Sequence, residues 1–88
     1  MAYYKQSSAT VQAKVGMGKL IGYLVSSTSS GTLKFYDSGA SSTSDPVMIN
    51  TVTPSAGASV LFGTGGMQFN KGLYVVAANT IEFTLIYE

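Results

Sequence analysis

Short runs of β-branched and aromatic residues fill most of this 88-residue chain, and glycines or Ser/Thr clusters separate the runs. No stretch repeats its apolar residues with the 3.6-residue period of an amphipathic helix. Runs rich in Val, Ile, Thr, Tyr and Phe that end at turn-forming residues are typical of all-β proteins. The sequence therefore predicts an antiparallel β-sandwich.

Eight short strands are expected, and they are Thr10–Val15, Lys19–Ser26, Thr32–Tyr36, Val47–Val52, Ser59–Phe62, Met67–Phe69, Leu73–Ala77 and Thr80–Tyr87. Asn79 tolerates a left-handed conformation and suits a tight turn between the last two strands. Gly22 lies inside the second strand, which predicts a β-bulge or a close approach by another backbone. The first eight residues fit no strand face, so the chain divides into an N-terminal arm, residues 1–8, and a single domain, residues 9–88.

Apolar side chains are more numerous than one face of these strands can hold. Strand alternation assigns to the core Val11, Ala13, Val15, Leu20, Leu24, Leu33, Phe35, Val47, Ile49, Val60, Phe62, Met67, Phe69, Leu73, Val75, Ile81, Phe83 and Leu85. Further apolar residues, Val25 and Leu61 among them, remain outside this set. A surplus rich in tyrosine is the composition of a protein–protein interface. The candidate interface residues are Tyr3, Tyr4, Ile21, Tyr23, Tyr36, Tyr74, Val76 and Ile86.

The small size of the chain also favours self-association. A domain of this length buries only about 60–65% of its unfolded surface, so its stability is expected to be marginal. Disulfides, a metal or oligomerisation usually compensate in such domains. The chain has no cysteine and no histidine, which removes disulfides and the commonest transition-metal ligands. Oligomerisation remains.

The residue types and motifs that enzymes use are scarce. Without His and Cys, the usual general base and thiol nucleophile are missing, and no G-x-S-x-G or S-x-x-K motif would activate a serine. Neither GMGKLIG nor GTGGMQF matches a phosphate-binding loop, and both are interpreted as strand turns. We predict no catalysis, no metal and no cofactor. One weak alternative is a calcium site in which Asp37 and Asp45, which flank one loop, would be ligands.

The charge of the chain argues against two classes of partner. The net charge is +1, from five lysines, no arginine and four carboxylates. Single-stranded nucleic acid could stack on Tyr23, Tyr36 and Tyr74 near Lys19, Lys34 and Lys71, but so few cations make a poor electrostatic groove. No polybasic cluster favours attachment to a membrane, and no apolar run approaches the roughly 20 residues that span a bilayer.

Two long segments resemble a known family. The run GKLIGYLVSSTSSGTLKFYDS, followed later by FNKGLYVVAANTIEFTLIYE, is similar to the small decoration (cement) proteins on the capsids of tailed bacteriophages. The similarity covers about residues 16–88. It is a pattern of strands and turns: a Gly-x-Leu-x-Gly-x-x-Val strand, a Ser/Thr turn, a Lys-x-Tyr-Asp strand and a late Gly-Leu-Tyr-Val strand before a closing hairpin.

The resemblance implies a β-sandwich, often a jelly roll, that binds as an oligomer to the outside of a capsid. It implies three further expectations: the major capsid protein as partner, a homotrimer with a dimer as alternative, and a place in the virion after assembly in the host cytoplasm. Two other functions remain open. One is another virion component, such as a tail or neck subunit, and the other is a carbohydrate-binding β-sandwich whose exposed tyrosines stack on sugar rings.

Overall fold

A computed structural model describes residues 3–63 and 65–88 of the chain, and these residues form one antiparallel sheet of seven strands with no helix. The all-β prediction is confirmed. The strands are β1 (Tyr3–Ser7), β2 (Val11–Val15), β3 (Gly18–Asp37), β4 (Val47–Val52), β5 (Ser59–Leu61), β6 (Met67–Phe69) and β7 (Gly72–Tyr87). The prediction of eight short strands is wrong, because two pairs of them join into the long strands β3 and β7.

The centre of the sheet is the pairing of β3 with β7, which extends from Leu20 opposite Tyr87 to Asp37 opposite Leu73. The N-terminal half of β3 also pairs with β5 and β6, and the C-terminal half of β7 pairs with β1. The C-terminal half of β3 pairs with β4, and the N-terminal half of β7 pairs with β2. We call the part that contains β1, β5 and β6 the first half-sheet and the part that contains β2 and β4 the second half-sheet.

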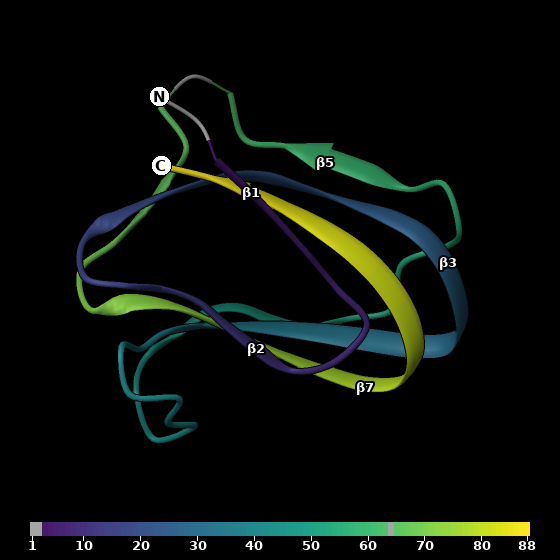
Figure 1. The fold of residues 1–88 in the computed structure, drawn as a ribbon, viewed down its shortest axis with the longest axis horizontal. Helices are drawn as coiled ribbons and strands as arrows, with labels where there is room; N and C mark the ends of the chain where they lie inside the picture. Colours follow the sequence, from purple (N-terminus) through teal and green to yellow (C-terminus); the bar gives the residue numbers. More distant parts are fainter. Residues whose placement is uncertain (1–2, 64) are drawn as a thin grey trace.

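Both long strands bend between the two half-sheets, at the right of the view in Figure 1, so that the half-sheets lie one above the other. At the bend Ser29 and Ser30 both pair with Thr80, which is a register shift. Ser30 and Asn79 have positive φ angles of 57° and 62°. The Asn79 side-chain amide donates a hydrogen bond of 2.7 Å to the carbonyl of Ser30 and so joins the two bends.

The turn signals in the sequence therefore mark bends, and the expected tight turn at Asn79 is absent. β3 and β7 keep hydrogen-bonding to each other on both sides of the bend, so neither strand forms a hairpin with itself there, although both turn back to form the second layer. A locally irregular backbone conformation bends a strand without ending it when the neighbouring strand bends at the same place. The closing hairpin expected from the resemblance is wrong for the same reason.

Two glycines are required because other atoms lie where a side chain would begin. A Cβ on buried Gly31, at the bend, would lie 2.5 Å from the Cβ of Ile81 and 2.7 Å from the carbonyl of Thr80. Gly22 lies at a register shift of β3 and is buried beneath β5, where a Cβ would collide with the backbone of Val60. The prediction of a bulge or a close backbone approach at Gly22 is confirmed.

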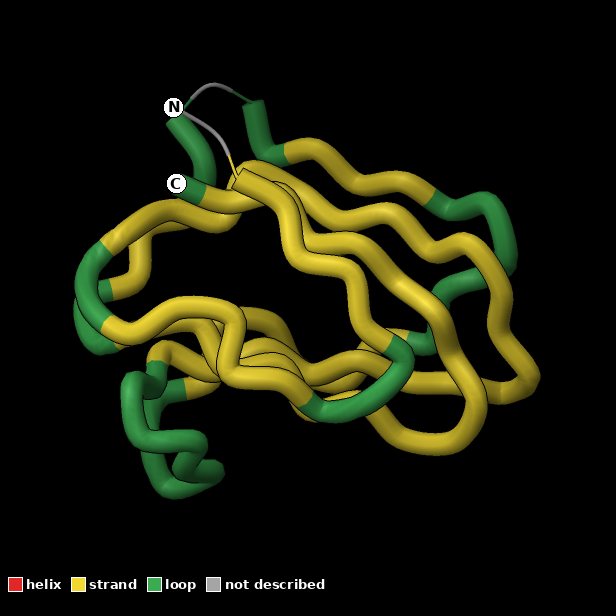
Figure 2. Tube along the Cα trace, in the orientation of Figure 1, coloured by secondary structure: helices red, strands yellow, loops and turns green. Residues whose placement is uncertain are grey.

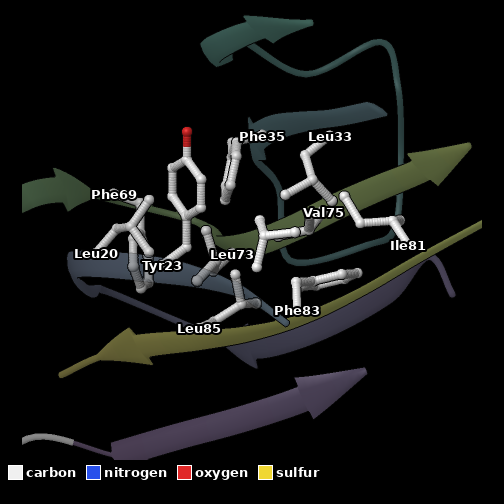
Figure 3. Packing of buried hydrophobic residues seen from close by; sticks show 11 residues of the cluster. Leu20, Tyr23, Leu33, Phe35, Phe69, Leu73, Val75, Ile81, Phe83 and Leu85 are labelled. Carbon is white, nitrogen blue, oxygen red and sulfur yellow. The ribbon is translucent and has the colours of Figure 1, made fainter. Parts of the chain in front are cut away.

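One hydrophobic cluster fills the space between the two half-sheets, as Figure 3 shows from close by. Its members come from β3, β6 and β7: Leu20, Tyr23, Val25, Leu33, Phe35, Phe69, Leu73, Val75, Ile81, Phe83 and Leu85. Both half-sheets contribute, so each is apolar on the side that faces the other. Figure 2 shows the strands of the two half-sheets with this space between them.

Five residues lie on a different side from the one that the sequence predicted. Tyr23 and Val25 belong to the core, whereas Val15, Leu24 and Val47 are 70%, 39% and 47% exposed. The register shift between Leu20 and Gly22 explains three of the five. One extra residue reverses the inward and outward alternation of the strand, so Tyr23 and Val25 point inward and Leu24 points outward.

The segment expected to be an arm is an edge strand of the first half-sheet. β1 pairs with β7 from Tyr3 opposite Tyr87 to Ser7 opposite Phe83, in register at every position. Figure 2 shows it beside the C-terminal half of β7. Residues 1–2 lie outside the described part of the chain. The division at residue 8 is therefore wrong for Tyr3–Ser7, because the backbone of this segment finds hydrogen-bonding partners in β7.

Candidate interaction surface

The outer face of the first half-sheet carries a row of apolar side chains. Tyr4 lies opposite Ile86 on β7, Ile86 lies opposite Gly22 on β3, and Gly22 lies opposite Leu61 on β5. Directly opposite residues of antiparallel strands point to the same side. Because Leu85, next to Ile86, is fully buried in the core, this row points away from the core.

Most of these side chains are accessible to solvent. Tyr4 is 77% exposed and Leu61 68%, while Ile86 is partly exposed. Leu24 lies two residues after Gly22 in β3 and on the same face, opposite Thr84 on β7 and Ser59 on β5. We call Tyr4, Leu24, Leu61 and Ile86 the outer patch. It contains no charged side chain and spans four neighbouring strands, which is the character of a protein contact surface.

The outer face of the second half-sheet carries the other predicted tyrosines, but it is partly covered. Tyr36 and Tyr74 lie opposite each other with ring centroids 6.0 Å apart, and the Lys34 amino group lies 5.3 Å from the centroid of the Tyr36 ring. Tyr36 is only 6% exposed although it is not part of the core cluster. Val76 and Tyr74 are partly exposed on the same face.

The loop between β3 and β4 projects beneath this second half-sheet in Figure 1, and Gln12 of β2 tethers it. The Gln12 side-chain amide donates hydrogen bonds to the carbonyls of Ser38 (2.6 Å), Lys14 (2.8 Å) and Leu73 (3.1 Å). Its oxygen accepts hydrogen bonds from the backbone N–H and the hydroxyl of Ser41. One half-buried side chain therefore joins the loop to β2 and β7.

The eight candidate interface residues do not form one surface. Tyr23 lies in the core, where it is 6% exposed and packs on Phe35 with ring centroids 5.2 Å apart. Burial raises the pKa of its phenol. The remaining candidates divide between the outer side of the first half-sheet (Tyr4, Ile86), its β1 edge near the Tyr87 ring (Tyr3), a position near Gly66 (Ile21) and the second half-sheet (Tyr36, Tyr74, Val76).

The interpretation from the sequence missed Leu24 and Leu61 as members of the outer patch. The sequence pattern places Leu61 among the surplus apolar residues outside the candidate interface, and it places Leu24 in the core. The signal that could have found both is Gly22. A bulge there reverses the faces of the residues that follow it in β3 and brings β5 close enough for Leu61 to cover the glycine.

The two acidic residues considered as calcium ligands are occupied by hydrogen-bond donors. Oδ1 of Asp37 accepts hydrogen bonds from the backbone N–H groups of Lys71 (2.7 Å), Asn70 (3.0 Å) and Gly72 (3.3 Å). Asp45 forms an ion pair of 3.0 Å with the Lys71 amino group. Among the described residues, no three groups of the acidic, Cys or His types lie together as a metal site.

These bonds change the proton affinity of Asp37. Desolvation disfavours the charged carboxylate, but the N–H bonds from Lys71, Asn70 and Gly72 together with the Lys71 charge outweigh it, so the pKa of Asp37 is lowered. A carboxylate with a lowered folded-state pKa stabilises the fold above its unfolded-state pKa, and this contribution disappears as the pH falls through the folded-state value. The connection between β6 and β7 is therefore held by an ionised side chain.

We expect the Asp37→Asn variant to be less stable than the wild type at neutral pH, because a neutral amide accepts weaker hydrogen bonds from the three N–H groups. The difference in unfolding free energy should begin to shrink below about pH 4, where the carboxyl takes up its proton in the unfolded chain, and should disappear as the pH falls through the lower folded-state pKa. Urea titrations at a series of pH values measure it. Asp45→Asn is the control, with a smaller effect because its ion pair is exposed. A stability difference that is independent of pH would contradict this role.

Other kinds of site find little support in the described residues. One open pocket of about 320 Å³ is lined by Lys14, Met17, Gly18, Lys19, Gln68 and Glu88. Its lining includes neither a nucleophile with an adjacent base nor an aromatic platform. Tyr23 and Tyr36 are buried, so two of the three rings considered for nucleic-acid stacking cannot receive a base. No helix that could cross a membrane occurs in residues 3–63 and 65–88.

Comparison with known proteins identifies no relative. The chain matches no protein-family model, no curated protein and no solved structure at a significant level.

Proposed function

We propose that this protein is a structural virion protein that binds the outside of a tailed-phage capsid and stabilises the shell. The observation that carries the proposal is the outer patch, which places four apolar side chains on the solvent side of the first half-sheet. A monomeric protein this small gains nothing from exposed Tyr4 and Leu61, whereas a protein that binds a shell buries them. The strand pattern that resembles decoration proteins supports the same proposal.

The finer description of the fold belongs to this proposal. The bend in β3 and β7 lays one half-sheet over the other with a single apolar cluster between them, which favours a two-layer β-sandwich. The jelly-roll connectivity is implied by the resemblance. The proposed partners are the major capsid protein and other copies of this chain, and the proposed place is the capsid surface after assembly in the host cytoplasm.

The test is a reconstruction of the virion that contains this chain. Density that fits the chain on the outer surface of the shell, with the outer patch against the major capsid protein or another copy, is the expected result. Density in the tail or neck would favour the alternative of another virion component. A glycan array probed with the isolated protein tests the sugar-binding alternative, and binding there with no density on the shell would overturn the proposal.

A further inference from the structure

β1 is the one described edge strand with neither a register irregularity nor a very short length. β2 and β4 pair with β7 and β3 through register shifts, and β5 and β6 have only three residues each. Bulges and short strands protect the edge of a sheet from pairing with another chain. β1 has five residues in unbroken register with β7, and no other strand of the described residues pairs with its other side. Its edge is therefore the least protected part of the sheet.

The side chains of β1 give its edge little protection. Charged residues, lysine above all, and proline protect an edge, and β1 has one of these, Lys5, beside the exposed rings of Tyr3 and Tyr4. Tyr4 points to the outer side with Ile86, while Tyr3 and Lys5 point to the same side as Tyr87 and Leu85. An added strand would therefore extend the outer patch beyond Tyr4 without interruption.

We propose that β1 pairs antiparallel with β1 of a second copy of this chain, about a twofold axis at Tyr4. The first half-sheets of the two copies then form one continuous sheet, and the two outer patches become one apolar surface across it. This inference rests on the edge of β1 and does not depend on the capsid assignment. It selects the dimer, the alternative to the expected homotrimer, because a strand that pairs with its own copy closes after two chains.

The register follows from which side chains would lie opposite each other. When the axis passes through Tyr4, the Tyr4 rings of the two copies are neighbours on the outer face, and Lys5 lies opposite Tyr3 of the second copy. Aromatic pairs and a lysine beside a tyrosine ring are both favourable contacts. When the axis passes through Lys5, two lysines lie opposite each other, which is unfavourable. An axis at Gln6 leaves both tyrosines without an aromatic partner.

The contact is small, so the pair is expected to be weak and dependent on concentration. A chain without cysteine allows a direct test, because any disulfide that forms reports the single thiol introduced. The variants are Tyr4→Cys, Lys5→Cys and Gln6→Cys, at three exposed positions. Opposite residues of paired strands have Cα atoms about 4.5–5.5 Å apart, which a disulfide can bridge. A residue next to the axis is offset from its own counterpart by two positions along the strand, which puts the two Cα atoms more than about 7 Å apart, too far for a disulfide, and Gln6 is further still.

Under mild oxidation of the folded protein we expect Tyr4→Cys to form a disulfide-linked dimer about tenfold faster than Lys5→Cys and Gln6→Cys. The same variants in denaturant, where all three thiols are equally accessible, should react at similar rates. Sedimentation of the wild type should show a monomer–dimer equilibrium that Tyr4→Asp abolishes, because two carboxylates would then be opposed. Equal rates for the three folded variants, a fastest reaction at Lys5→Cys or Gln6→Cys, or a monomeric wild type at high concentration would overturn the proposal.

Discussion

Replacement of Leu85 by alanine is expected to lower the free energy of unfolding by about 3–5 kcal/mol. Leu85 is fully buried between the half-sheets, at the centre of the pairing with Tyr23 on one side and Lys5 on the other. Its removal takes away buried methyl groups and leaves a cavity that β3 and β7 cannot close, because their backbones are hydrogen-bonded on both sides. Since domains of this size have little stability to lose, the variant should be largely unfolded at room temperature.

Leu61→Ala is the matched control, with the same chemical change at a side chain that is 68% exposed. Its effect on the unfolding free energy should stay within about 0.5 kcal/mol. Urea denaturation followed by circular dichroism measures both variants. Similar losses at the two positions would mean that the assigned core is wrong. In a capsid-binding assay Leu61→Ala should bind more weakly than the wild type although it is folded, since it alters the outer patch.

The second large effect is expected at the bend. A methyl group at Gly31 would collide with the Cβ of Ile81 and with the carbonyl of Thr80, so neither contact can be relieved by a simple rotation of a side chain. Overpacking against backbone and against a branched core residue costs about 3 kcal/mol. We expect Gly31→Ala to lose about that much stability, and thermal unfolding is the measurement.

Gly65→Ala is the corresponding control, because no described atom outside its own residue and its chain neighbours lies within 4 Å of the place where its Cβ would be. A glycine-to-alanine change at an unobstructed position is neutral or slightly stabilising, since alanine has fewer unfolded conformations to lose. If Gly31→Ala is as stable as Gly65→Ala, the two bent strands do not approach each other as closely at the bend as this structure shows.

The sequence itself determined the class of the fold, and the reason is local. Alternation of apolar and polar residues depends on the geometry of a single strand, so Phe83 and Leu85 could be assigned to the core without knowing their neighbours. The special role of Gly22 was also predictable, because a glycine inside a strand pattern has few explanations. The lack of His and Cys, two of the commonest catalytic residue types, can also be read from the sequence alone.

Other features depended on contacts between distant segments, and only the tertiary structure decided them. Ser30 and Asn79 are residue types that favour turns, yet they lie at the bends of two strands whose pairing continues past them. Residues 3–7 become a strand only because the edge of β7 is available to them. The bulge at Gly22 decides which of Tyr23 and Leu24 is buried. A shift of one residue exchanges the faces of a strand at little local cost, so the packing of the half-sheets selects the side.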